Sequence, residues 1–156
     1  MIRLRPVTTA DLELVCRHRE AMFVESGRPR DRIAKMVPTF RAWLEPRLAD
    51  GRYGGFVAEL EGEPIGGIGL MEIDWPPHPF HPDECRRGYV LNVFVAPQHR
   101  RRGLARRMVV AAQIELERRG LSYAILHATE AGRPLYETMG WEPTAEMAKR
   151  LDQGGD

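Results

Sequence analysis

Residues 93–108 have the types and spacing expected of an anion-binding loop. The apolar run Val93-Phe94-Val95 stops before Pro97, and Gly103 then opens an apolar-periodic segment. This pattern predicts a strand, a short basic loop and the N-terminus of a helix. Such a junction gathers unpaired backbone N–H groups and the positive end of a helix dipole at one point. The chemistry expected there is the binding of a phosphate or pyrophosphate.

Two common phosphate-binding motifs do not fit this loop. A P-loop requires Lys and then Ser or Thr after its last glycine, and a dinucleotide fingerprint requires three spaced glycines. The loop instead reads Arg100-x-x-Gly103-x-Ala105, in which the small residues let the backbone approach a bulky anion. It resembles the pyrophosphate loop of the Gcn5-related N-acetyltransferase (GNAT) superfamily, Gln/Arg-x-x-Gly-x-Gly/Ala, which binds acetyl-coenzyme A.

A second segment, residues 131–141, strengthens the resemblance. It reads Ala-Gly-Arg-Pro-Leu-Tyr-Glu-Thr-Met-Gly-Trp and is similar to the family's last helix and strand, Ala-x-x-Leu-Tyr-x-x-x-Gly-Phe. Gly132 stands where the family often has Ala, and Trp141 where it often has Phe. Thr129 occupies the place of an Asn that helps to hold the pantetheine arm in many members. One helix and one strand are expected between the two motifs, as in the family.

The resemblance implies an acetyl-CoA-dependent N-acetyltransferase in which a primary amine attacks the thioester directly, in a ternary complex. Tyr136 matches the family's general acid, which protonates the leaving thiolate. The implied cofactor-binding residues are Val93, Phe94, Val95, Arg100, Arg101, Arg102, Gly103, Leu104, Ala105, Arg106 and Thr129. Backbone groups of Val93 and Val95 would contact the pantetheine arm, and backbone N–H groups from Arg101 to Arg106 would hold the pyrophosphate.

The acceptor and the general base are not identified by the sequence. Glu72, Asp74 and Glu84 are expected near the acceptor side, and water could also relay the proton. The family shapes its acceptor site with the first two helices and the loop before the central strand, here residues 26–31 and 75–87. These segments have no dominant charge, so a small-molecule amine and a peptide N-terminus both fit.

Two other functions stay open at this point. A catalytically weak acyl-CoA-binding sensor would use the same fold, and it would bind coenzyme A without turnover. A nucleic-acid module could use the arginines of residues 99–102, but a formal net charge of +1 argues against it and against membrane binding. A homodimer is possible.

The expected elements alternate in the order of the GNAT fold. Strands are predicted at residues 2–5, 53–60, 65–73, 89–95 and 122–128 and from residue 141 onward. Helices are predicted up to residues 26–27, through residues 33–44, and at residues 104–118 and 133–139, with Pro38 kinking or splitting the second. The resemblance implies an α/β (α+β) architecture: a central mixed, largely antiparallel sheet, two splayed parallel central strands, and helices on both faces.

Composition agrees with one globular domain over residues 1–152, followed by a frayed tail at residues 153–156. The chain has 156 residues and is 43% hydrophobic. Cys16 and Cys85 are unclustered, and neither a signal sequence nor a membrane span is predicted, so a bacterial cytoplasm with reduced thiols is expected.

Two further patterns have structural interpretations. His78, His81 and Cys85 are spaced as metal ligands could be, but the intervening prolines favour a surface loop, and no metal is expected. The run Gly66-Gly67-Ile68-Gly69 mimics a dinucleotide loop, yet it lies within a predicted strand and favours a bulge or a close-packed hairpin.

Overall fold

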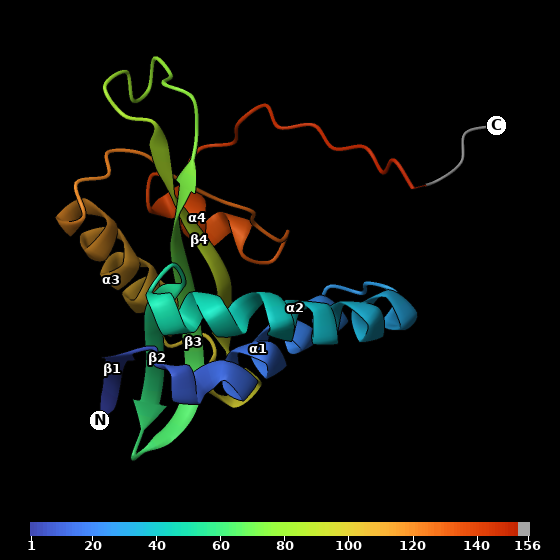
Figure 1. The fold of residues 1–156 in the computed structure, drawn as a ribbon. Coiled ribbons are helices and arrows are strands. Elements are labelled where there is room, and N and C mark those ends of the chain that lie inside the picture. Colours follow the sequence, from blue (N-terminus) through green and yellow to red (C-terminus); the bar gives the residue numbers. More distant parts are fainter. Residues whose placement is uncertain (153–156) are drawn as a thin grey trace.

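The computed structural model describes residues 1–152 (Figure 1). In chain order the elements are β1 (Ile2–Pro6), the 3-10 turn η1 (Thr9–Asp11), α1 (Leu12–Glu25), α2 (Arg30–Asp50), β2 (Gly54–Leu60), β3 (Glu63–Asp74), β4 (Arg86–Val95), η2 (Pro97–His99), α3 (Leu104–Arg118), β5 (Ala124–Leu126) and α4 (Arg133–Thr138).

The five strands form one sheet in the order β1-β2-β3-β4-β5. The first three pairings are antiparallel, and β4 pairs with β5 in parallel. The chain returns from β4 to β5 through α3, as a parallel crossover requires. The predicted mixed, largely antiparallel sheet is confirmed.

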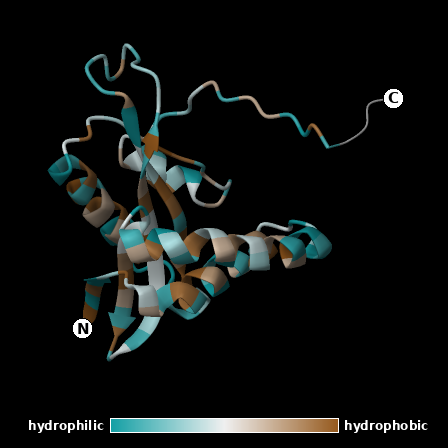
Figure 2. Ribbon diagram, in the orientation of Figure 1, coloured by the Kyte–Doolittle hydropathy of each residue, from teal (hydrophilic) through white to brown (hydrophobic). Residues whose placement is uncertain are grey.

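Helices cover both faces of the sheet, and each face has its own apolar core (Figure 1). On one face α3 packs against the strands through Leu104, Met108, Val109, Ala112 and Leu116. On the other, α1 and α2 contribute Leu12, Val15, Cys16, Phe40, Leu44 and Leu48. Figure 2 shows hydrophobic residues concentrated along the strands between these helices. The β4 strand is therefore sandwiched, with Val90, Val93 and Val95 in the α3 core and Tyr89 and Leu91 in the α1/α2 core.

The prediction that Pro38 splits the second helix is wrong. α2 runs unbroken for 21 residues with both Pro38 and Pro46 inside it. Both prolines are exposed, as are the residues four positions before them, so water can reach the carbonyl groups that lose a partner. Each proline costs about 3 kcal/mol. Burial of the apolar face that includes Phe40 and Leu44 contributes about 1.5–3 kcal/mol per side chain and offsets that cost.

The predicted strand from residue 141 onward is also wrong within the described residues. After α4 the chain runs as an extended segment away from the sheet (Figure 1). Pro143 cannot donate to a ladder, and Met147 and Leu151 are 95% and 86% exposed, so no apolar contact holds this segment on the sheet. β5 is likewise shorter than predicted, at three residues. The predicted frayed tail at residues 153–156 lies outside the described residues.

Candidate active site

The strands β4 and β5 separate partway along the sheet. Their pairing covers only Gly88 to Val90 on β4, whereas β4 continues to Val95. Beyond Val90 the main-chain groups of β4 on the β5 side have no strand partner. A row of exposed backbone donors and acceptors therefore lines the split between the two parallel strands.

A β-bulge at Asn92 lies at the point where the strands separate. Asn92 has a φ of 53°, and the β3–β4 register shifts between Gly67 and Gly69. Leu91 packs in the α1/α2 core, whereas Val93 packs against the α3 core, although the two are an even number of residues apart. An extra residue reverses the alternation of side chains in this way. The bulge thus re-aims β4 within the split.

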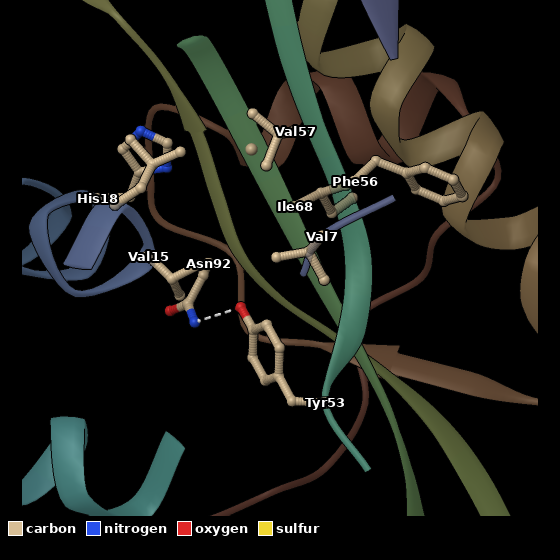
Figure 3. A pocket seen from close by; sticks show the side chains of 10 residues that line it. Val7, Val15, His18, Tyr53, Phe56, Val57, Ile68 and Asn92 are labelled. Carbon is tan, nitrogen blue, oxygen red and sulfur yellow. Dashed lines mark hydrogen bonds between the residues drawn. The ribbon is translucent and has the colours of Figure 1, made fainter. Parts of the chain in front are cut away.

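Buried hydrogen bonds hold the bulge in place. The Asn92 amide donates to the Tyr53 hydroxyl at 2.9 Å, as Figure 3 shows beside a small internal cavity, and its carbonyl accepts from Arg19 Nη1 at 2.8 Å. Tyr53 fits only because residue 69 is glycine, since a Cβ there would overlap the phenol ring. The glycine run is therefore a close-packed strand with a bulge beside it, as predicted.

The loop before α3 presents a concave row of unpaired N–H groups. Arg101 and Gly103 have φ values of 64° and 75°, and Gly103 is the N-cap of α3. Within residues 1–152, the backbone N–H groups from Arg101 to Arg106 have no backbone acceptor. A Cβ on Gly103 would meet open space. Alternating left-handed residues at a helix start form an anion-binding nest.

The arginines of this loop do different jobs. Arg100 anchors the loop, because its Nε donates to the Val95 carbonyl and its Nη2 contacts the Glu25 carboxylate, each at 2.8 Å. Arg106 Nη2 donates to the Thr138 hydroxyl at 2.7 Å and ties α3 to α4. Arg101 and Arg102 are exposed, and no described residue pairs with their side chains.

Tyr136 and Thr129 lie at the start of the last helical segment. Tyr136 packs against the α3 core and against Trp141, at 6.4 Å between ring centroids. Burial raises the pKa of its phenol, which keeps the group protonated, and its hydroxyl has no hydrogen-bond partner among the described residues. The Thr129 hydroxyl accepts from the Gly132 N–H at 3.1 Å, so it stabilises the turn before α4. A Cβ on Gly132 would crowd both Tyr136 and Thr129, which explains the glycine.

A cavity of about 630 Å³ opens on the opposite face of β4. Its lining comes from α1, α2, β3 and β4 and consists of Arg19, Arg32, Lys35, Met36, Thr39, Phe40, Trp43, Met71, Ile73, Tyr89 and Leu91. The first two helices, α1 and α2, contribute seven of the lining residues. The expected segments 26–31 and 75–87 do not line it, because the cavity sits over the middle of the sheet. Its mouth on β4, at Leu91, adjoins the bulge.

Comparison with known proteins identifies the family. Residues 15–141 match the profile of the Acetyltransferase (GNAT) family. The chain belongs to the GNAT family of N-acetyltransferases. A GNAT crystal structure from Ralstonia eutropha JMP134 has 54% sequence identity and a TM-score of 0.96, with 97% of this chain and 99% of that chain covered. The recognition and fold class expected from the sequence are confirmed.

Other GNAT neighbours are more distant. A predicted acetyltransferase from Clostridium acetobutylicum, solved with acetyl-CoA, has 25% identity and a TM-score of 0.84, with 96% of each chain covered. An aminoglycoside N-acetyltransferase in complex with CoA shares the fold at 18% identity and a TM-score of 0.70, with 99% of this chain and 96% of that chain covered. No curated protein matches the chain. None of the helices within residues 1–152 is long and apolar enough to cross a membrane.

The carboxylates considered as bases for this GNAT enzyme lie outside the cavity. Glu72 pairs with Arg86 at 2.8 Å, Glu84 accepts from the Ser122 hydroxyl at 2.8 Å, and Asp74 is the last residue of β3. One lining residue of the cavity, Tyr89, begins a polar chain whose other members, His127 and Glu146, are exposed and do not line the cavity. The sequence analysis assigned no role to this chain. The Tyr89 hydroxyl lies 3.1 Å from His127 Nδ1, and His127 Nε2 lies 3.0 Å from the Glu146 carboxylate.

His81 of the β3–β4 loop forms hydrogen bonds within the fold. Arg87 Nε donates to His81 Nε2 at 2.9 Å, and His81 Nδ1 faces the Glu84 carbonyl at 3.1 Å. The Arg87 guanidinium stacks on Trp75 and Tyr123. Both ring nitrogens of His81 thus have partners, and the loop is a packed surface loop as interpreted from the sequence.

Proposed function

We propose that this GNAT protein transfers the acetyl group of acetyl-CoA to a primary amine by direct attack in a ternary complex. The observation that carries the proposal is the split between β4 and β5. It lies between a nest of unpaired N–H groups and a cavity large enough for a small amine. A co-substrate with a phosphate end and a reactive end, laid along the split, would meet an acceptor in that cavity.

The cofactor side uses the main chain. The N–H groups from Arg101 to Arg106 would hold the pyrophosphate, helped by the α3 dipole and by the Arg101 and Arg102 side chains. The backbone of β4 around Phe94, from Val93 to Val95, which has no strand partner on the β5 side within the described residues, would bind the pantetheine arm, with Thr129 across the split. A backbone N–H near the bulge would stabilise the oxyanion that forms as the amine attacks. When bound, acetyl-CoA supplies the activated acyl group.

Tyr136 would act as the general acid toward the departing thiolate. Its pKa, raised by burial, keeps it protonated at neutral pH, and its hydroxyl is uncommitted within the described part of the chain. It comes from α4, on the far side of the split from the acceptor cavity. An acid on that side can protonate sulfur without competing for the proton of the amine.

We further propose that residues 1–152 act as one catalytic domain in the cytoplasm. Cys16 is buried, Cys85 is exposed, and the two are not joined in a disulfide, which suits a reducing compartment. A homodimer is compatible with this arrangement, because the proposed site is built from one copy of the chain.

Thiol release from acetyl-CoA across a library of primary amines tests the function. Amine-dependent release, with acetylated product found by mass spectrometry, is the expected result. Stoichiometric coenzyme A binding with no turnover on any amine would instead assign the protein to the acyl-CoA sensors.

A further inference from the structure

The cavity carries three cationic side chains, and no carboxylate lines it. Arg19 comes from α1, and Arg32 and Lys35 come from the first two turns of α2. Except for Thr39 and Tyr89, the other lining side chains are apolar or aromatic, among them Phe40, Trp43, Met71 and Leu91. The acceptor cavity therefore combines an apolar body with a uniformly positive set of charges.

The positive charge of Arg19 has no carboxylate partner among the described residues. Its guanidinium is half-buried, and burial lowers its pKa. Nη1 contacts the Asn92 carbonyl, the guanidinium lies over the Phe23 and Phe40 rings, and the buried Nε has no acceptor among residues 1–152. A desolvated cation is stabilised by a nearby anion, and none of the described carboxylates provides one within salt-bridge distance.

The rim of the cavity already binds a carboxylate. Arg32 contacts Asp152 at 3.4 Å, at the end of the extended C-terminal segment. Lys35, one turn further along α2, has no acidic partner in the part of the chain that the structure describes. The Asp152 carboxylate thus pairs with one of the three cations. A carboxylate group is therefore chemically suited to this rim.

We propose that the acetyl acceptor is a primary amine that also carries a carboxylate and an apolar or aromatic body, as an aromatic amino acid does. This inference rests on the proposed N-acetyltransferase function. The carboxylate would lie among Arg19, Arg32 and Lys35, and the apolar body would lie against Phe40, Trp43 and Met71. Polycationic acceptors such as aminoglycosides would meet three like charges and be excluded.

Binding and turnover test the proposal separately. Calorimetry on the coenzyme A-saturated protein compares L-phenylalanine with L-phenylalaninamide, and 4-(aminomethyl)benzoate with benzylamine. The ligands with a carboxylate should bind at least tenfold more tightly than their partners without one. Binding of the carboxylates without thiol release on any amine would refute the acetyltransferase and leave the cavity assignment intact. Turnover with equal affinity for the paired ligands, or a preference for an aminoglycoside, would overturn the cavity assignment alone.

Charge-removing variants then assign the contact. Lys35→Gln should weaken the carboxylate ligand about tenfold and leave the amide unchanged, whereas Lys149→Gln, at the chain's other lysine, should change neither. Arg19→Gln should act like Lys35→Gln, with partial recovery in Arg19→Lys, which keeps the charge. Equal weakening of both ligands in Lys35→Gln and Arg19→Gln would mean that the two side chains only support the fold of the cavity, and would overturn the contact.

A second inference concerns the proton of the amine, and it rests on the hydrogen-bonded chain from Tyr89 through His127 to Glu146. Among the cavity-lining residues, Tyr89 and Thr39 carry hydroxyl groups, and within residues 1–152 only the Tyr89 hydroxyl is hydrogen-bonded onward to a titratable side chain. The other titratable side chains that line the cavity are Arg19, Arg32 and Lys35. Burial raises the pKa of Tyr89, so the phenol begins protonated and donates toward His127 Nδ1.

The geometry points to Tyr89 and His127 as the route by which the attacking ammonium loses its proton. As Tyr89 Oη takes a proton from the ammonium, its own proton moves to His127 Nδ1. The products are a neutral amine, a neutral phenol and an imidazolium whose Nε2–H faces the Glu146 carboxylate at 3.0 Å. Tyr89 would be the catalytic residue, and His127 and Glu146 would receive and stabilise the charge.

Acceptors of different basicity separate this role from a structural one. With benzylamine, which is an ammonium ion at neutral pH, Tyr89→Phe and His127→Asn should each lower kcat/KM at least tenfold. With aniline, which is already neutral, the same variants should have no more than a twofold effect. Equal losses for the two amines would mean that Tyr89 and His127 merely shape the cavity, and full activity of both variants with benzylamine would remove the relay.

Discussion

The two sides of β4 are built by different means. On the side of the loop at residues 100–106 the proposed binding groups are main-chain N–H donors at one strand–helix junction. On the side of the cavity they are side chains from α1, α2, β3 and β4, and the outermost of them, Arg19 and Leu91, are 72 positions apart along the chain. A site made of main-chain groups needs glycines at fixed positions relative to the strand and the helix. This requirement leaves a short local pattern in the sequence. A site made of side chains needs only that its residues line the same cavity in the folded chain. This requirement leaves no short local pattern in the sequence.

The largest effect is expected from Gly103→Val. A β-branched side chain at a φ of 75° is strained and would project into the open space proposed for the pyrophosphate. Coenzyme A affinity should fall about a thousandfold, or about 4 kcal/mol, as measured by calorimetry. Gly62→Val is the matched control, because Gly62 has a φ of 85° and open surroundings in the β2–β3 turn. Unchanged affinity in a folded Gly103→Val would remove the loop from the site.

The acceptor-side packing of β4 should be sensitive to acid. His18 stacks on Phe94 at 4.5 Å between ring centroids, and burial lowers its pKa to about 4 from a reference value of 6.5. The unfolded chain therefore binds a proton first as the pH falls. The contribution of His18 to the free energy of unfolding should be fully present above pH 6.5. It should decline by about 3 kcal/mol as the pH approaches 4.

Denaturant unfolding at a series of pH values measures this decline. His18→Phe keeps a ring against Phe94 and removes the titration, so its stability should depend less on pH over the same range. Parallel curves for the variant and the wild type would show that other groups set the acid sensitivity.

Tyr136→Phe should lower turnover about a hundredfold, the lower end of the range for general acid catalysis, because water can partly replace the hydroxyl. Acetyl-CoA affinity and stability should be unchanged, since the ring still packs on Trp141. Steady-state kinetics combined with calorimetry distinguishes the two quantities. Full turnover would contradict the assignment of Tyr136 as the general acid. It would not affect the proposal that the loop at residues 100–106 binds the cofactor.

The smallest effect is expected from Arg101→Ala and Arg102→Ala. Both side chains are exposed, and exposed ion pairs contribute about 1 kcal/mol or less. Each variant should weaken coenzyme A by no more than about fivefold in calorimetry at physiological salt. A loss of several kcal/mol from either would show that the cofactor side also depends on side chains, and the contrast between the two sides of β4 would disappear.

The sequence predicted the elements near the cofactor loop best. α3 was predicted at its observed bounds, and Gly103 opens it as an N-cap. The incorrect predictions concern segments whose secondary structure depends on tertiary contacts. Burial of the apolar face of α2 overcomes two prolines. The segment after Trp141 lies away from the sheet, so it forms no ladder within the described residues.

By itself the sequence determined the family, the order of the elements as far as α4, and the strand–loop–helix junction that opens α3. Each of these follows from local rules: apolar periodicity, a glycine at a left-handed position, and the unpaired donors of a helix start. The tertiary structure alone decided where β4 and β5 part, how Asn92 reverses the faces of β4, and which side chains meet in the cavity. Those features depend on hydrogen bonds such as those from Asn92 to Tyr53 and from Arg19 to Asn92, which join residues 39 and 73 positions apart. No local pattern records a contact of that range.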